Sequence, residues 1–370
     1  MGTKNNFEKM GLNKIINASG RMTALGVSTL SKEVSNAVVE GGENYVDIDS
    51  LFKKSGELVS MHTGAEASLV TSSASAGIAI SVAALIAKGN LKHIRDLPNS
   101  DSLKNEIIIP KGHLVEFGAP ISTMVKIGGG KIAEAGLINS VKKIDIINEI
   151  TERTAGLLYV KSHHTVQKSM ISLTEMLEVA KEYDLPLIVD AAAEEDLRKY
   201  ISLGADMVIY SGAKAIEGPT SGFITGKQKF IKNAFLQYQG IGRPMKIGKE
   251  GIMGLIKALE LYEAKDNKKI VDNMIKNVNK IIENINHLPL IEAKKIKDEA
   301  GRDIYRVEIK ILEGNAFDVE AELRTENPSI YTRTHRLNEG IISLDVRSLS
   351  DLEVNIVIQR LLELFEKREH

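Results

Sequence analysis

The sequence of 370 residues contains no cysteine. This absence excludes disulfide bonds, zinc sites made of thiolates and cysteine nucleophiles, and it is typical of proteins in a reducing compartment. No apolar run is long enough to cross a bilayer, because the longest, residues 76–87, falls well short of the roughly 20 residues that a membrane helix needs. The first twenty residues lack the apolar stretch of a secretory signal. We therefore expect a cytoplasmic protein without a membrane partner, in which residues 76–87 form a buried helix.

The chain also lacks a surplus of either charge. Its 48 basic and 49 acidic side chains give a formal net charge of -1, so no overall positive field attracts a nucleic acid, and we expect none as a partner. Apolar residues make up 43% and charged residues 26% of the chain, which is ordinary for a soluble globular protein. A chain of this length exceeds what one core usually organises, which predicts a large and a smaller domain that share a cleft.

Strand-like runs alternate with helical stretches between about residues 106 and 226. The runs are EIIIPK, KIAEAG, GLLYVK, LPLIVDAAA, MVIYSGAK and GFITGK. Helical spacing between them, at residues 144–154 and 173–183, is typical of crossover helices. This rhythm predicts an α/β domain with a largely parallel sheet covered by helices.

The pattern changes after about residue 248. Residues 251–285 have the spacing of one long helical stretch, YRVEIKILE and IISLDVRS have strand character, and residues 351–369 form a closing amphipathic helix. We therefore expect an N-terminal segment of residues 1–50, a large domain of residues 51–248 and a smaller α+β domain of residues 249–370.

Two charged residues follow strand-like runs of the predicted sheet. Asp190 ends LPLIV, and Lys214 follows MVIYSGA, so both belong at the edge of the sheet where ligands bind in α/β folds. Pyridoxal phosphate needs a lysine that forms an imine with its aldehyde and then moves a substrate proton, and an aspartate that keeps its ring nitrogen protonated. Small residues beginning at Ser211 allow the backbone to approach a flat ring. A structural ion pair is the alternative interpretation.

A phosphate site is predicted in LVTSSASAGIAI, where a β-run ends at Thr71 and Gly77 opens an apolar helix. Free backbone N–H groups at a helix start, together with serine hydroxyls, bind phosphate well. The residues concerned are Ser73, Ala74, Ser75, Ala76 and Gly77. A serine that only caps a core helix is the alternative.

Further candidates follow other strands. His113, in KGHLVEFGAP, is placed to stack on a cofactor ring, although a lone histidine in a loop is more often only hydrogen-bonded. Ser162, His163 and His164 follow GLLYV at the same predicted sheet edge, and adjacent histidines favour contact with substrate or cofactor over zinc. Arg347, in LDVRS, has the fork geometry that binds a carboxylate, and a surface arginine on a strand is its alternative.

Several long segments together resemble the D-glucosaminate-6-phosphate ammonia-lyase family, in the selenocysteine-synthase-like branch of fold type I pyridoxal-phosphate enzymes. They are VDAAAEEDLR, DMVIYSGAKAIEGPTSGFITG, VKSHHTVQK, TSSASAGIAI and MKIGKE, and the likeness runs from about residue 16 to about residue 348. The resemblance implies an aspartate-aminotransferase-like α/β fold, with a large, mostly parallel α/β/α domain and a smaller α+β C-terminal domain.

The resemblance also implies a homo-oligomer built on dimers, with Lys214 as the imine lysine, Asp190 at the pyridine nitrogen and residues 73–77 at the phosphate. It places His113 near the ring, and the N-terminal segment with Arg21 near the substrate entrance. These implied roles of Lys214, Asp190 and the serine loop agree with the interpretation made from the residues alone.

The implied reaction converts D-glucosaminate 6-phosphate to 2-keto-3-deoxy-6-phosphogluconate and ammonia by α,β-elimination. Lys214 is the natural base for the proton at C2, and His163 and His164 are candidates for the acid that assists the departing hydroxyl. A distal phosphate on the substrate needs basic partners, and those available are Arg243, Lys246, Lys249 and Arg333.

Three alternatives remain. A selenocysteine synthase would act on seryl-tRNA, but we expect neither an extra N-terminal module nor a basic surplus in this chain. Another lyase or an aminotransferase would use the same cofactor-holding residues, which do not decide the bond that breaks. A cofactor-free binding protein would have no need of Lys214, Asp190 and the serine loop.

Overall fold

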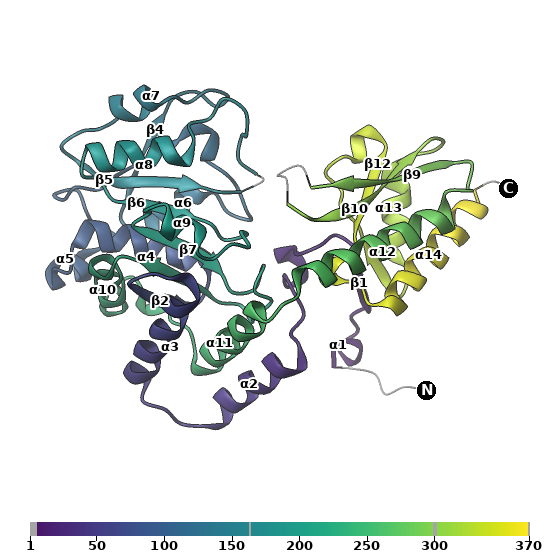
Figure 1. Ribbon diagram of the computed structural model, residues 1–370, viewed down its shortest axis with the longest axis horizontal. Helices are drawn as coiled ribbons and strands as arrows, with labels where there is room; N and C mark the ends of the chain where they lie inside the picture. Colours follow the sequence, from purple (N-terminus) through teal and green to yellow (C-terminus); the bar gives the residue numbers. More distant parts are fainter. Residues whose placement is uncertain (1–5, 163, 299–301, 369–370) are drawn as a thin grey trace. The chain divides into compact units, whose positions relative to one another are not determined.

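The protein consists of two compact units (Figure 1), which a computed structural model describes over residues 6–162, 164–298 and 302–368. The large unit comprises Leu30–Ala264, and the small unit comprises Met1–Thr29 together with Lys265–His370. Each has its own hydrophobic core, which is the usual property of a domain.

A seven-stranded sheet forms the centre of the large unit, in the order β2-β8-β7-β6-β5-β3-β4. β8 is antiparallel to both β2 and β7, and the remaining pairs are parallel. This confirms the predicted, largely parallel sheet. The strands are β2 (Ala67–Thr71), β3 (Glu106–Pro110), β4 (Lys131–Ala135), β5 (Thr154–Val160), β6 (Leu187–Asp190), β7 (Met207–Ser211) and β8 (Gly222–Gly226).

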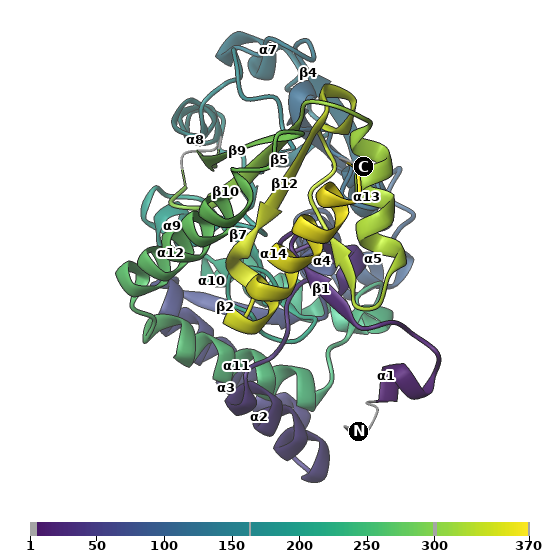
Figure 2. The same ribbon diagram turned by 90° about the vertical axis from the view of Figure 1, so that its right-hand side faces the viewer.

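Helices cover both faces of this sheet (Figures 1 and 2). α4 (Ala74–Ala87) crosses strands β5 to β8 on one face, and α8 (Leu173–Glu182) lies against β5 on the other. Because its residues 76–87 are all buried, α4 confirms the predicted core helix. The others are α2 (Lys32–Glu43), α3 (Ile48–Thr63), α5 (Leu91–Asp96), α6 (Ile121–Ile127), α7 (Lys143–Asn148), α9 (Lys199–Ser202), α10 (Gln228–Leu236) and α11 (Lys249–Glu263).

The small unit is built on an antiparallel sheet in the order β12-β10-β9. α12 packs on this sheet and against α14 (Figure 2). β1 pairs in parallel with β11. The elements are α1 (Asn6–Lys9), β1 (Ile15–Asn17), α12 (Asn267–Ile285), β9 (Ile291–Lys297), β10 (Tyr305–Ile311), α13 (Ala316–Thr325), β11 (Ser329–Tyr331), β12 (Ile341–Asp345) and α14 (Asp351–Glu366). The predicted closing helix and both predicted strands are confirmed.

The boundaries of the units differ from the predicted ones at 50/51 and 248/249. α2 and α11 pack closely together in the large unit: a Cβ on Gly41 would lie 2.8 Å from the Glu250 backbone, and one on Gly254 would lie 2.6 Å from Val38. The first residues belong instead to the small unit, because β1 pairs with β11. Packing between segments distant in sequence sets these limits.

Some predicted helices have different ends. The stretch 251–285 contains two helices rather than one, because α11 ends at Glu263 and Asp266 caps the start of α12. The helix expected at 144–154 ends at Asn148, and Thr154 already belongs to β5. α4 begins three residues before Gly77 because Ser73 provides its cap.

Within the described ranges, no helix combines the length and the apolar character needed to span a bilayer.

Candidate active site

Asp190 is the last residue of β6, a strand paired on both sides in the middle of the sheet. The Lys161 N–H donates to the Asp190 carbonyl at 2.8 Å, and the Ala191 N–H donates to the Ile209 carbonyl at 2.9 Å. The carboxylate is buried, with 7% of the residue exposed, and its Oδ1 accepts from the Ala192 N–H at 3.1 Å. Neighbouring backbone on both sides therefore holds this acid in place.

Asp190 and Lys214 act on each other electrostatically. Burial raises the pKa of Asp190, and the Ala192 N–H and the Lys214 charge oppose that rise. Burial lowers the pKa of Lys214, and the Asp190 charge opposes that change. The two predicted residues therefore lie near enough for each charge to affect the pKa of the other, and burial favours the neutral, nucleophilic form of the Lys214 amine.

Lys214 lies in a tight turn between β7 and β8. A Cβ on Gly212 would lie 2.2 Å from Ser221 Oγ and 2.7 Å from Leu255, so a side chain at this position would require both neighbours to shift. The Gly212 N–H donates to the Ser221 carbonyl at 2.9 Å, and the Gly218 N–H donates back to Gly212 at 2.8 Å. This turn carries the lysine just beyond Ser211, which is half-buried at the end of β7.

The predicted phosphate loop is a strand-to-helix turn. Ser73 caps α4 by accepting the Ala76 N–H at 3.0 Å, and Ala74 and Ser75 stand in the first turn, where N–H groups have no partner within the helix. Gly77 packs against β7, because a Cβ there would lie 2.9 Å from Ile209. Ile209 is the partner of Asp190 in the register, so the helix start, the acid and the lysine lie at one edge of the sheet.

These groups fit pyridoxal phosphate. The buried Asp190 carboxylate suits a protonated ring nitrogen, because a cation stabilises a desolvated anion. The amine of Lys214 suits an aldehyde, and the start of α4 suits a phosphate. A Cβ on Gly222 would lie 2.6 Å from the Ala74 nitrogen, so the glycine allows β8 to pack directly against the turn that begins α4.

His113 follows β3 and is 2% exposed. The Val160 N–H donates to its Nδ1 at 3.3 Å, and the ring of Tyr159 meets it edge-on, with 4.6 Å between centroids. Burial, and to a lesser extent the Lys161 charge, lowers the pKa of His113 to about 4. His113 also lines a cavity of about 220 Å³ with Tyr159, Lys161 and Gln167. Its stacking on a cofactor ring stays a prediction.

The loop after β5 holds the remaining predicted residues of the large unit. Ser162 Oγ accepts the His164 N–H at 3.2 Å, and the Ser162 carbonyl accepts from Thr165 Oγ1 at 2.7 Å and from Gln167 Nε2 at 3.0 Å. This loop follows the strand beside β6, as the sequence predicts. His163 lies outside the described residues.

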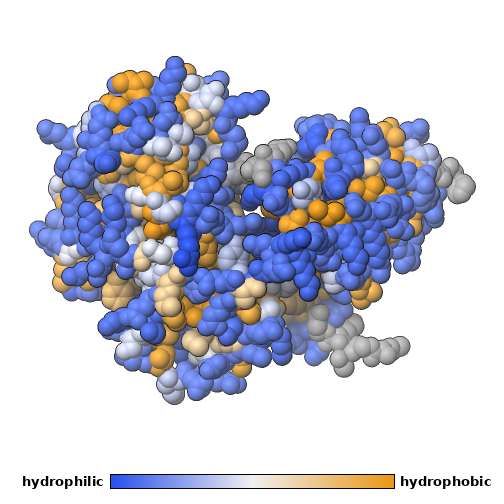
Figure 3. All heavy atoms as spheres, in the orientation of Figure 1, coloured by the Kyte–Doolittle hydropathy of each residue, from blue (hydrophilic) through white to orange (hydrophobic). Residues whose placement is uncertain are grey.

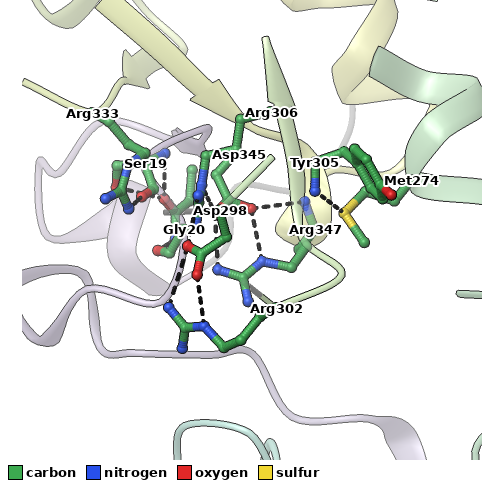
Figure 4. Close-up of polar contacts among 11 residues, drawn as sticks. Ser19, Gly20, Met274, Asp298, Arg302, Tyr305, Arg306, Arg333, Asp345 and Arg347 are labelled. Atoms are coloured by element: carbon green, nitrogen blue, oxygen red, sulfur yellow. Dashed lines mark hydrogen bonds and ion pairs between the residues drawn. The ribbon is translucent and has the colours of Figure 1, made fainter. Parts of the chain in front are cut away.

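Arg347 lies in the small unit, where its fork is bound to a carboxylate of the protein itself (Figure 4). Its Nε and Nη2 donate to the two oxygens of Asp345 at 2.9 and 2.8 Å. Asp345 is fully buried and also accepts from Arg306 Nε at 3.0 Å. Sequence reasoning missed Asp345 and Arg306, although Asp345 stands only two residues before Arg347.

Arg333 belongs to the same group of charges, which we call the arginine cluster: Arg302, Arg306, Arg333, Arg347, Asp298 and Asp345 (Figure 4). Asp298 binds Arg302 and Arg306, each at 2.9 Å. Arg333 Nη1 donates to the Ser19 carbonyl at 3.4 Å. Burial and the neighbouring Arg306 lower the pKa of Arg333. Four guanidinium groups face two carboxylates here, so the cluster favours an added anion.

The N-terminal segment lies against the arginine cluster. Gly20 has a φ of +89, and a Cβ there would lie 2.8 Å from Asp345 Oδ2, so the position requires glycine. Asn17 Nδ2 donates to the Gly20 carbonyl at 2.8 Å. This arrangement places Arg21, the next residue and half-buried, in the same unit as Arg333 and Arg347.

The other basic candidates are less suited to a substrate phosphate. Lys249 Nζ caps α2 by donating to the Gly41 and Gly42 carbonyls, so its ammonium group has a structural role. Arg243 and Lys246 are exposed. Arg333 is therefore the member of the predicted set that lies in a built, positively charged site.

Comparison with known proteins places this chain among pyridoxal-phosphate enzymes. The profile of the SelA family, described as L-seryl-tRNA selenium transferase, matches residues 15–317. The chain is 46% identical to D-glucosaminate-6-phosphate ammonia lyase of Salmonella typhimurium, over 98% of this chain and 99% of that protein. It is 35% identical to 5'-C-glycyluridine monooxygenase-decarboxylase of Streptomyces, over 97% of this chain and 91% of that protein.

Comparison with solved structures leads to the same group of proteins. A structure of D-glucosaminate-6-phosphate ammonia-lyase matches with a TM-score of 0.93 and 45% identity, covering 100% of both chains. Aspartate aminotransferase from Thermotoga maritima matches with a TM-score of 0.54 and 14% identity, over 97% of this chain and 94% of that one. The expected fold, that of fold type I pyridoxal-phosphate enzymes, is thereby confirmed.

Proposed function

The chain belongs to the SelA (L-seryl-tRNA selenium transferase) family, and on this premise we propose that it is a pyridoxal-phosphate-dependent ammonia lyase acting on D-glucosaminate 6-phosphate. The observation that carries the proposal is the full-length identity of 46% to the Salmonella ammonia lyase. The electrostatically coupled pair of Asp190 and Lys214 supports the cofactor part of it.

Bound pyridoxal phosphate supplies an electron sink that stabilises negative charge at C2 of an amino acid. In this chain Lys214 would hold the cofactor and then accept the proton from C2, a task that suits an amine whose pKa burial has lowered. Asp190 would hold a proton at the ring nitrogen, and Ser73 with the start of α4 would bind the phosphate.

The reaction balances as a loss of ammonia. The C2 proton and the C3 hydroxyl leave as water, and hydrolysis of the dehydrated product returns one water, so that a keto acid and ammonia remain. His163 and His164 stay the proposed acids for the departing hydroxyl, with Ser162 as a substrate contact in the same loop. A histidine serves this role because its ordinary pKa lies near neutrality.

Arg333 is the residue that we propose for an anionic group of the substrate. It is half-buried beside other guanidinium groups, and partial burial, followed by the charge of Arg306, lowers its pKa. A carboxylate or phosphate beside it would relieve that repulsion. The Arg347 guanidinium group donates to Asp345, so Arg347 would affect substrate binding through Asp345. Arg21 completes the proposed set.

We also propose a cytoplasmic homo-oligomer built on dimers. The visible face of each unit is mainly hydrophilic, with smaller groups of apolar residues (Figure 3). Exposed large apolar side chains include Phe7, Met10, Tyr45, Met61 and Leu137. Contacts between subunits would bury side chains of this kind, and sedimentation of the purified protein would test the proposal, since a stable, active monomer contradicts it.

Two relatives named for other reactions give the alternatives to the proposed function. The seryl-tRNA selenium transferase of Clostridium botulinum is 26% identical, over 95% of this chain and 83% of that protein. The Streptomyces monooxygenase-decarboxylase shows that a 35% identical relative bears the name of a different reaction. Residues that hold a cofactor therefore do not choose the bond that breaks.

The test compares wild type, Lys214→Ala and the control Lys232→Ala, an exposed lysine of the same unit. Each is incubated with pyridoxal phosphate and D-glucosaminate 6-phosphate, and cofactor absorbance and released ammonia are recorded together. We expect ammonia and a keto acid from wild type and control only. A lysine-dependent absorbance band without ammonia would contradict the substrate and keep the cofactor, and absence of the band would contradict both.

A further inference from the structure

The loop of residues 191–198 follows Asp190 directly and carries three successive acidic residues, Glu194, Glu195 and Asp196. Three tyrosine hydroxyls donate to these residues in turn: Tyr200 to the Glu194 carboxylate, Tyr262 to the Glu195 carbonyl and Tyr210 to the Asp196 carbonyl. We call these three hydroxyls the tyrosine clasp. Each comes from a different element, α9, α11 and β7 respectively.

Two of the three phenols, those of Tyr200 and Tyr210, stay protonated. Tyr200 and Tyr210 are 2% and 1% exposed. Burial raises the pKa of both phenols well above their ordinary range, and the nearby Glu194 charge raises them further. Both hydroxyls are therefore hydrogen-bond donors throughout the physiological range of pH.

Tyr262 stands in the last turn of α11, just before the chain passes to the small unit at Lys265. The next residue, Glu263, is 3.5 Å from Arg198 and 2.9 Å from His62. Arg198 also donates to the Met61 carbonyl at 3.0 Å. The end of α11 is thus tied to the loop after Asp190 and to the end of α3.

We propose that Tyr200, Tyr210 and Tyr262 are positioning residues for Asp190, an inference that rests on the proposed role of Asp190 at the cofactor. The Asp190 carboxylate accepts from the Ala192 N–H, which belongs to the clasped loop. The shape of the loop therefore sets the direction of the carboxylate. Tyr262 in addition transmits to this loop any displacement of the α11 end.

Tyr238 provides a matched control. Its hydroxyl donates to the Val70 carbonyl at 3.0 Å, and burial raises its pKa as in the clasp. A Tyr→Phe change removes the same kind of bond at each site and keeps the ring that packs. The loss in Tyr238→Phe falls on β2 instead of on the loop after Asp190.

The experiment uses full-length Tyr200→Phe, Tyr210→Phe, Tyr262→Phe and Tyr238→Phe. Backbone hydrogen exchange over residues 191–198 is measured without cofactor, together with the Kd for pyridoxal phosphate and the pH dependence of the bound cofactor's absorbance. We expect the clasp variants to exchange roughly 10-fold faster in this loop, to bind the cofactor several-fold more weakly and to shift the pH dependence. Tyr238→Phe should match wild type in all three.

Equal loop exchange, cofactor affinity and pH dependence in clasp and control variants would overturn the proposal, because the hydroxyls would then contribute to stability alone. The melting temperature of each variant separates that general effect from the local one. A wild type that binds no pyridoxal phosphate would instead overturn the proposed function. The hydrogen-exchange measurement is made without cofactor, so it still tests the clasp in that case.

Discussion

The backbone N–H of Val160 donates to Nδ1 of His113 over 3.3 Å. An Nδ1 that accepts a hydrogen bond carries no proton, so the imidazole is the neutral tautomer protonated on Nε2. Burial lowers the pKa of His113 to about 4, from an ordinary value of 6.5. At a pH between these two pKa values, the unfolded chain therefore carries a proton on His113 and the folded chain does not.

The first prediction concerns this titration. Stability should be complete above pH 6.5 and should fall as the pH drops to about 4, by up to roughly 3 kcal/mol from this residue. His113→Gln, which cannot titrate, should show a smaller fall. Urea unfolding at pH 7 and pH 4 measures the difference, with the exposed His287→Gln as control. An equal fall in both variants would contradict the prediction.

Asp190→Asn should separate function from stability. The pKa of Asp190 is raised by burial, so its charge costs stability as the pH rises above the ordinary value of about 4. Without cofactor, the variant should melt at the same or a higher temperature at pH 8, and its activity should fall on the order of 100-fold or more. Calorimetry and ammonia release measure the two effects.

Asp206→Asn serves as the contrasting variant for that measurement. Asp206 Oδ2 accepts the Leu187 N–H at 2.8 Å, and Oδ1 is 2.7 Å from Lys227. This carboxylate is partnered, so its loss should lower the melting temperature. A melting temperature that falls equally in both variants would mean that Asp190 is structural.

Arg333→Ala should weaken substrate binding. Loss of a charged hydrogen bond to a substrate anion is expected to raise KM about 10- to 100-fold with a smaller change in kcat. Arg324→Ala is the control, because Arg324 is 47% exposed and pairs with Glu320 in the same unit. Steady-state kinetics of ammonia release decide the matter, and an unchanged KM in Arg333→Ala would rule out the proposed contact.

Acid should destabilise the arginine cluster. Burial acts to raise the pKa of both carboxyls, but the bound arginines outweigh it: they lower the pKa of Asp298 to about 2 and hold that of Asp345 well below its ordinary 3.8. The stability from these groups is present above about pH 4 and is lost as the pH falls through the lowered values. Asp345→Asn should cost about 3–5 kcal/mol at pH 7, because it removes the buried charge that binds both Arg306 and Arg347.

That cost should shrink on acidification, since below about pH 4 the Asp345 carboxyl of the unfolded wild type binds a proton that the folded protein does not bind. Urea unfolding of wild type and Asp345→Asn at pH 7 and pH 3 measures it. A destabilisation that stays constant with pH would show that the carboxylate charge is not what matters.

The sequence by itself determined the features that depend on neighbours in the chain. Strand runs that end at Asp190 and Ser211, and the serine that caps α4, follow from hydrophobic pattern and capping over a few residues. These local patterns sufficed to predict the parallel sheet, Lys214 with Asp190, and the start of α4 as a phosphate site. They misplaced helix ends, because caps such as those at Ser73 and Asp266 compete with the pattern.

Only the tertiary structure decided which charged residues and strands contact each other across the fold. Arg306 and Asp345 are separated by 39 positions and meet because β10 and β12 pair, and β1 joins the small unit by pairing with β11. Asp345, which is buried in the folded small unit, also binds the guanidinium group of Arg347 two positions further along the chain, although the sequence had suggested a substrate carboxylate as the partner of Arg347. A buried charge takes its partner from whatever the fold places beside it, and no local pattern records that choice.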